Sequence, residues 1–267
     1  ELFRYKTDIT NIELDIGPPK KEKLFQLLEE NAFIGDIVTI GGLLTYTKDK
    51  DVETTLEDDA EARDAMREVF SNTARWPTGF KGFTADVFAN INGEEQKAKV
   101  TVKGPKDITI SDVEEKTKSF LNENLSSIAM HRGPRSFEES DGKYKLIFGD
   151  DGSHPLGRKL VMGGDGMSSF YRIKDGRIQQ INRQTPRFSF SINIEESQKN
   201  QDGKFLTRKY SVFYFNPETK GLKDVESYTD EYTRVGEADL PKMRRIINCE
   251  EGSISVSTMT LSNHELI

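Results

Sequence analysis

Residues 83–104 read FTADVFANINGEEQKAKVTVKG, and this stretch decides the fold. Apolar and polar side chains alternate over residues 83–91, which is the period of a strand with one buried face. Asn92 and Gly93 follow, a pair typical of a type I′ turn because both central residues take a positive φ. The alternation resumes over residues 98–102, so the stretch predicts an antiparallel β-hairpin.

Similar turn-forming residue pairs recur along the rest of the chain. Asp-Gly pairs stand at residues 141–142, 151–152, 175–176 and 202–203, and apolar or aromatic runs lie between them. Including the late segments, the sequence predicts roughly ten strands, with the runs after the first hairpin at residues 144–148, 159–162, 170–173, 178–181, 188–194, 205–215, 225–235, 243–248 and 254–261.

Two segments have the period of an amphipathic helix instead. Residues 59–75 place apolar side chains at i, i+3, i+4 and i+7, and the Trp76-Pro77 pair ends the pattern. Residues 112–130 repeat the periodicity, and Ser111 with Glu114 has the spacing of a capping box.

These elements predict an α+β fold that is mostly β. Strands joined in a row by tight turns form an antiparallel meander, and two helices cannot cover ten strands. We therefore expect a strongly curled antiparallel sheet or open β-barrel, with the two helices packed on it or capping it.

The first 57 residues differ from the rest. Residues 20–30 have helical spacing behind two prolines, and residues 33–46 read as a strand pair or bent strand. We expect an N-terminal arm or small extension over residues 1–57 and the sheet domain over residues 58–267.

Composition excludes several classes of function. The 267 residues carry a net charge of −7, which argues against binding to duplex nucleic acid, and no apolar run is long enough to cross a bilayer. With a single cysteine, Cys249, and the scattered histidines His131, His154 and His264, we expect no metal site. Residues 163–166 lack the Lys-Ser/Thr of a phosphate-binding loop, no dinucleotide fingerprint is present, and we expect no cofactor.

The segment that follows the second helix holds the candidate site. A histidine and an arginine in a last helical turn complement the helix dipole, which is a purely structural interpretation. The alternative places these groups at the mouth of the barrel, where they bind an anionic head group or form an acid–base set. The candidates are His131, Arg132, Arg135, Glu138 and Glu139.

Aromatic residues crowd the late strands. Phe213 and Phe215 share one face of their strand and Tyr214 has the other. These side chains form either core or the lining of a ligand-binding interior, and we add Phe213 and Phe215 to the candidate ligand-binding residues.

Five segments carry a resemblance to a known family: residues 62–70, 80–87, 131–139, 182–183 and 207–210. They resemble an uncharacterised family found in cyanobacteria and in plant and algal chloroplasts. The resemblance covers about residues 58–250 and implies a protein of the chloroplast stroma or the cyanobacterial cytoplasm. The strand of residues 83–87, followed by residues 100–105, is also similar to lipoprotein-carrier half-barrels, which favours a curled sheet.

We expect a non-enzymatic binding or assembly protein, because the spaced residue patterns of nucleophilic, metal or phosphoryl chemistry are not visible in the sequence. Its partner would be a small apolar or pigment-like ligand, or a larger protein complex on which it docks. The alternative is an enzyme that uses an acid–base set of His131, Arg132, Arg135 and Glu138.

Overall fold

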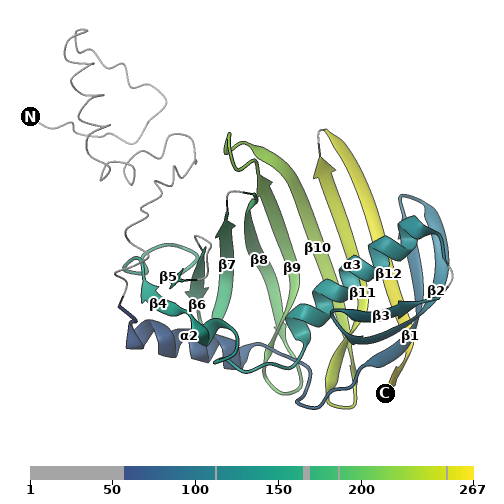
Figure 1. Cartoon of the computed structure of the whole chain (residues 1–267), viewed down its shortest axis with the longest axis horizontal. Helices are drawn as coiled ribbons and strands as arrows, with labels where there is room; N and C mark the ends of the chain where they lie inside the picture. Colours follow the sequence, from purple (N-terminus) through teal and green to yellow (C-terminus); the bar gives the residue numbers. More distant parts are fainter. Residues whose placement is uncertain (1–56, 112, 165–168, 186, 251) are drawn as a thin grey trace, which may run out of the picture. The chain divides into compact units, whose positions relative to one another are not determined.

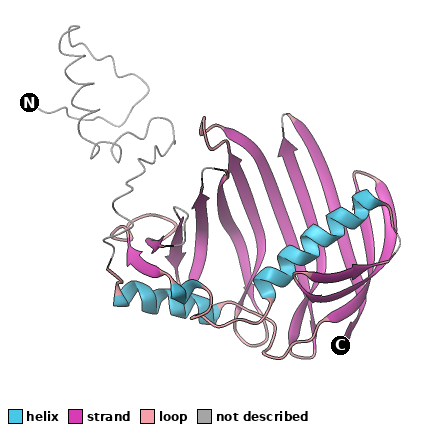
Figure 2. Cartoon of the chain, in the orientation of Figure 1, coloured by secondary structure: helices cyan, strands magenta, loops and turns pink. Residues whose placement is uncertain are grey.

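The computed structural model describes residues 57–267, apart from residues 112, 165–168, 186 and 251. They belong to one compact unit, Leu56–Ile267. The predicted N-terminal arm lies outside the described residues, except for Glu57, and stays a prediction. Two helices, α2 (Ala60–Asn72) and α3 (Glu115–Arg132), accompany a short 3-10 turn, η4 (Asp141–Lys143), and a large sheet (Figures 1 and 2).

The sheet has twelve strands, all paired antiparallel, in the order β3-β2-β1-β12-β11-β10-β9-β8-β7-β6-β5-β4 (Figure 1). The strands are β1 (Phe83–Ile91), β2 (Glu94–Gly104), β3 (Asp107–Ile110), β4 (Lys145–Phe148), β5 (Arg158–Gly163), β6 (Ser169–Lys174), β7 (Arg177–Gln184), β8 (Ser189–Lys199), β9 (Phe205–Phe215), β10 (Leu222–Val235), β11 (Ala238–Glu250) and β12 (Ser253–Leu266).

The mostly β, antiparallel class and the first hairpin are confirmed. Asn92 and Gly93 have φ values of 53° and 94°, as the predicted turn requires. Strands β4 to β12 follow one another as neighbours, whereas β1 pairs with β12, so the N-terminal hairpin extends the sheet beyond the C-terminal strand.

The expected strong curl of the sheet is not supported. Strands β3 and β4 form its two edges, and the sheet is not closed into a barrel. Closure is not needed for burial, because α2 covers one end of the sheet and α3 covers the other (Figure 2).

Each helix builds its own hydrophobic core. Ala62, Met66 and Val69 of α2 are at most 2% exposed and pack with buried side chains of β4, β5 and β6. Leu121 and Leu125 of α3 are at most 1% exposed and pack with buried side chains of β1, β2, β11 and β12.

The starts of the two helices differ. Asp59 caps α2, since its carboxylate accepts hydrogen bonds from the backbone N–H groups of Glu61 and Ala62 at 2.8 and 3.4 Å. The capping box predicted at Ser111 and Glu114 is wrong: the Ser111 hydroxyl accepts the backbone N–H of Lys99 instead. Ser111 directly follows the short strand β3, which the sequence pattern did not predict.

Both helices pack on the same face, which we call the helix face; the opposite one is the outer face. The strand register shows which residues of each strand lie on the helix face, because directly opposed residues on neighbouring strands lie on the same face. Tyr171, in the α2 core, lies opposite Ile181, which lies opposite Ile192 and then Val212. Two residues before Val212 on β9, the Tyr210 hydroxyl accepts a hydrogen bond from the Arg244 guanidinium beneath α3.

Candidate functional site

The last turn of α3 carries the first two candidate residues, of which Arg132 is buried against the sheet and His131 is exposed. Arg132 is 8% exposed and donates to the backbone oxygen of Ala74 at 3.2 Å and to the hydroxyl of Tyr232 at 3.1 Å. His131 has its Nδ1 2.7 Å from the Ser127 carbonyl oxygen. Partial desolvation by the surrounding protein, and then the charges of Arg132 and Arg135, lower the pKa of His131.

The other polar candidates lie on the exposed surface and make local contacts. Arg135 donates to the carbonyl oxygen of Met130 in the last turn of α3 at 2.6 Å. Glu138 lies 3.9 Å from Arg67 of α2, and Glu139 accepts from the Ser136 hydroxyl at 2.8 Å. These contacts fit the structural interpretation of the segment.

The described residues place no hydrogen bond or ion pair between His131 and Glu138 or Glu139. An acid–base set needs such groups within hydrogen-bond reach of each other or of a substrate. The enzymatic alternative therefore stays a hypothesis, and no contact between these groups supports it within the described residues.

Phe213 and Phe215 lie on the outer face. Strand β9 is regular over these residues, and the Arg244 contact places Tyr210 on the helix face. Alternation then puts Val212 and Tyr214 on the helix face and both phenylalanines opposite. Their ligand-binding role stays a prediction, but they do not share a surface with His131.

Between the two cores, part of the helix face is covered by neither helix (Figure 1). Its side chains come from β8 and β9 and are half-buried, except for Val212, which is 5% exposed. We call this surface the central apolar stretch; it consists of Phe190, Ile192, Ile194, Val212 and Tyr214.

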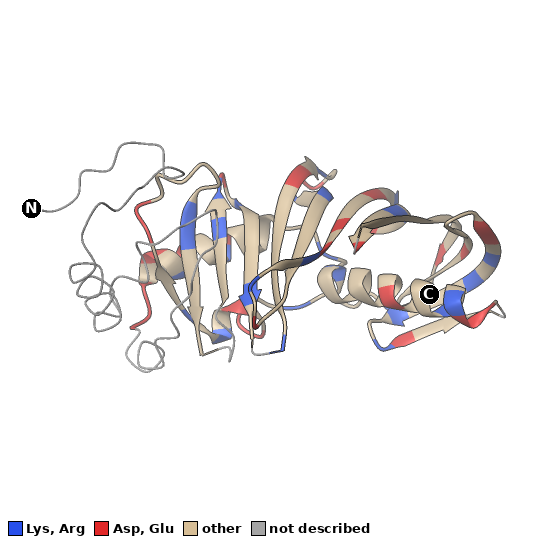
Figure 3. Cartoon of the chain, turned by 90° about the horizontal axis from the view of Figure 1, so that it is seen from above, with Lys and Arg blue, Asp and Glu red and all other residues tan. Residues whose placement is uncertain are grey.

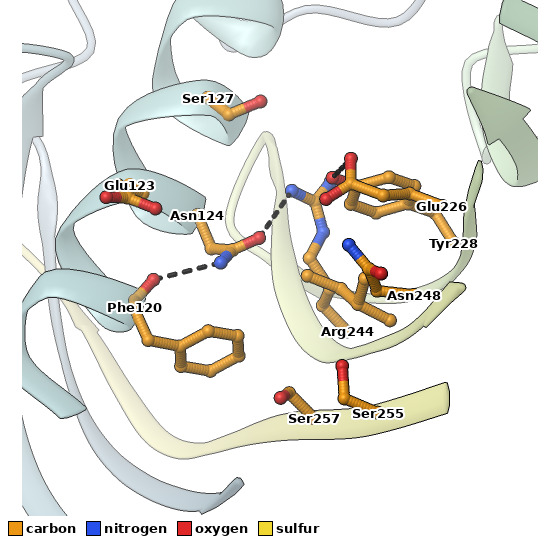
Figure 4. A pocket seen from close by; sticks show the side chains of 11 residues that line it. Phe120, Glu123, Asn124, Ser127, Glu226, Tyr228, Arg244, Asn248, Ser255 and Ser257 are labelled. Carbon is orange, nitrogen blue, oxygen red and sulfur yellow. Dashed lines mark hydrogen bonds between the residues drawn. The ribbon is translucent and has the colours of Figure 1, made fainter. Parts of the chain in front are cut away.

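Beside this stretch lies a pocket of about 270 Å³ between α3 and strands β10, β11 and β12. Figure 4 shows side chains of α3 on one side and side chains of the strands on the other. The lining is mostly polar, and its members are Phe120, Glu123, Asn124, Ser127, Glu226, Tyr228, Arg244, Ile246, Asn248, Ser255 and Ser257.

The basic side chain of the pocket is neutralised within the protein. Arg244 donates to both carboxylate oxygens of Asp230, at 2.8 and 2.7 Å, and each side chain is only 5% exposed. It also donates to the Asn124 side-chain oxygen at 3.3 Å, which ties α3 to β11. Burial alone would lower the pKa of Arg244, but Tyr210 and Asp230 raise it, so the guanidinium is held charged.

Glu226 joins the pocket to the central apolar stretch. One of its carboxylate oxygens accepts the hydroxyls of Tyr214 and Tyr228 at 2.9 and 2.8 Å. Tyr228 also stacks on Tyr210, with ring centroids 4.5 Å apart and an interplanar angle of 4°. Burial, followed by the nearby charge of Glu226, raises the pKa of Tyr214 and of Tyr228.

Within the described ranges, no cluster of three or more His, Cys, Asp or Glu side chains could hold a metal ion. Among the helices described, none is long and apolar enough to cross a membrane. Acidic and basic residues are interspersed over the sheet and both helices (Figure 3).

The pocket residues were not among those singled out from the sequence. Asn124 and Arg244 are 120 positions apart, and Glu226 follows no recognisable motif. The available signal was the tyrosine-rich alternation of β9 and β10, in which Tyr210, Tyr214 and Tyr228 share one face.

Comparisons with known proteins place the chain in a family. A model of the family described as protein of unknown function (DUF3386) matches residues 57–267. Among solved structures, the chain is similar to a LolA superfamily protein from Nitrosomonas europaea, with a TM-score of 0.31 and 12% identity over 77% of this chain and 93% of the other. It is also similar to a DUF1329 family protein from Desulfovibrio piger, with a TM-score of 0.24 and 9% identity over 79% and 94% of the two chains. No curated protein matches the sequence. The chain belongs to the DUF3386 family.

Proposed function

We propose that the protein is a non-enzymatic binding protein whose helix face holds a ligand with an apolar part. The central apolar stretch carries the proposal, because it lies between the two cores and is covered by neither helix. Removing apolar surface from water contributes roughly 25 cal/mol per Å², so an apolar ligand laid on this stretch gains free energy.

The polarity of the two faces supports the same site. Directly behind Ile192 and Val212, the outer face presents Ser191, Asn193 and Ser211, and Phe213 lies opposite Ser191 on that face. At the positions of Ile192 and Val212, the aliphatic side chains therefore lie on the helix face, and the outer face behind them is mostly polar.

The test compares two substitutions on neighbouring positions of β8. Ile192→Glu puts a charge in the central apolar stretch, and Asn193→Glu puts the same charge on the outer face. With a fluorescent fatty alcohol as probe, we expect Ile192→Glu to weaken binding at least tenfold and Asn193→Glu to leave it unchanged. Near-ultraviolet circular dichroism verifies folding, and equal affinities of the wild type and both variants would refute the proposal.

We further infer that the protein works in the chloroplast stroma or the cyanobacterial cytoplasm. The support is the family resemblance of residues 62–70, 80–87 and 131–139. Imaging of the protein, expressed from its own gene with a fluorescent protein fused at the C-terminus, tests this inference, and a signal outside these compartments would contradict it.

A second candidate function, docking on a larger protein complex, is favoured by one observation on the outer face. Apolar side chains of β11 and β12 are exposed there: Ile247 by 37%, Ile254 by 71% and Val256 by 39%. Native mass spectrometry of the protein from its own source, compared with an Ile254→Lys/Val256→Lys variant, tests this function. A complex formed by the wild type and lost in the variant would support it.

A further inference from the structure

Several polar groups that line the pocket beneath α3 have no hydrogen-bond partner among the described residues. Among the described residues, the hydroxyls of Ser127, Ser255 and Ser257 have no hydrogen-bond partner, although all three line the pocket. The second carboxylate oxygen of Glu226 and the side-chain oxygen of Asn248 are also without a donor in this part of the chain. Serine hydroxyls both donate and accept, whereas the other two groups only accept.

The charges around the pocket exclude an anionic head group. Arg244 is paired with Asp230, and the remaining charged side chains of the lining are Glu123 and Glu226. A phosphate or carboxylate would meet two negative charges here without a free positive one.

The hydrogen-bonding groups also argue against an ammonium head group. Glu123 and Glu226 would attract an ammonium, but an ammonium only donates, so it would leave the donor capacity of three serine hydroxyls unused. A hydroxylated head group both donates and accepts, so it matches all five groups. The aromatic side chains of Phe120 and Tyr228 line the same pocket, and an aromatic ring suits the C–H face of a sugar-like ring.

The size of the pocket matches part of an amphiphile. A volume of about 270 Å³ lies just below the roughly 300–1,000 Å³ of sites that enclose a whole drug-sized ligand. Tyr214 belongs to the central apolar stretch and donates to Glu226 in the pocket wall, so the two surfaces meet. One ligand can then place its chain on the stretch and its head in the pocket.

From these observations we infer that the ligand is an uncharged amphiphile with a hydroxylated, sugar-like head group, which the pocket beneath α3 recognises. The inference rests on the proposed function, because it assigns the apolar part of the same ligand to the central apolar stretch. It adds the chemical class of the head group and the residues that select it.

The experiment titrates the full chain calorimetrically with octyl glucoside, octyl phosphate, octylammonium and octanol, each kept monomeric. These probes share the octyl chain and differ in the head group. We expect octyl glucoside to bind at least tenfold more tightly than the other three. Octanol, which lacks a large head group, reports on the central apolar stretch alone.

Two variants of β12 distinguish binding of the head group from binding of the alkyl chain of the ligand. Ser255→Val/Ser257→Val removes two free hydroxyls, and we expect octyl glucoside to bind about tenfold more weakly and octanol to bind as before. Thr258→Val is the matched control, because Thr258 lies opposite Arg245 on the outer face. It should change neither affinity.

The outcomes distinguish the two proposals. If octanol and octyl glucoside both fail to bind, the proposed function fails. If octanol binds but the glucoside has no advantage, or if the β12 variant weakens both equally, the head-group assignment alone is overturned. Preference for octylammonium that disappears in Glu226→Gln would replace the hydroxylated head group with an ammonium.

Discussion

At the scale of single residues, the ion pair of Arg244 and Asp230 fixes the polar side of the site. Both side chains are 5% exposed, and the guanidinium also reaches Asn124 and Tyr210. A buried pair of this kind is costly to break, because the partner that remains is a buried charge without compensation.

Removing the arginine should therefore destabilise the fold strongly. We expect Arg244→Met to lower the free energy of unfolding by about 3–5 kcal/mol, measured by urea denaturation. Lys116→Met, which breaks an exposed pair with Glu94, should cost at most about 1 kcal/mol. An Arg244→Met/Asp230→Leu variant should be less destabilised than the sum of its single variants, and strict additivity would argue against a coupled pair.

Tyr228 makes stability depend on alkaline pH. Burial, and then the charge of Glu226, raise its pKa in the folded state above the ordinary value of about 10. Above pH of about 10 the unfolded chain loses a proton that the folded chain retains, so the free energy of unfolding falls as pH rises. The slope of the free energy of unfolding against pH, measured by urea denaturation at several pH values, should be shallower by up to about 1.4 kcal/mol per pH unit in Tyr228→Phe. An unchanged slope would contradict this assignment.

At the scale of elements, the segment before α2 serves both the helix and an edge of the sheet. Asp59 caps α2, while Asp58 accepts the backbone N–H of Leu146 on edge strand β4 at 2.9 Å. The backbone N–H of Asp59 donates to the carbonyl oxygen of Leu146 at 2.9 Å. The start of α2 thereby satisfies hydrogen-bonding groups that an edge strand would leave open.

Loss of the cap should weaken the α2 end of the molecule. We expect Asp59→Ala to cost about 1 kcal/mol of unfolding free energy and to speed amide hydrogen exchange in the first turn of α2. The α3 helix should keep its protection, because it packs in the other core. An equal acceleration of amide exchange in both helices would show that the two cores unfold together.

The sequence predicted the elements better than their assembly. Asn92-Gly93 and the helical spacing of residues 59–75 are local signals, and both correspond to elements of the structure. The alternation of β9 separated Tyr214 from Phe213, but which face meets the helices depends on pairing with β8 and β10. The open sheet likewise follows from long-range packing, which local periodicity does not contain.

At the scale of the whole molecule, the described unit has its own cores and coincides with the family match over residues 57–267. A chain that starts at Glu57 should therefore unfold in one cooperative urea transition, with the near-ultraviolet circular dichroism of the longer protein. A flat near-ultraviolet spectrum with retained far-ultraviolet signal would show that residues 1–56 are needed for packing.

The pairing of β1 with β12 also constrains how the protein is made. Synthesis proceeds from the N-terminus, so β1 and α3 leave the ribosome long before Met259 and Leu261, which complete their core. Until then, the core beneath α3 lacks the two buried side chains of β12, and the apolar side of α3 is exposed to aggregation or to binding by chaperones. A nascent chain that stalls before Ser253 can assemble the α2 core but not the complete α3 core, so synthesis of β12 controls when the α3 core can form.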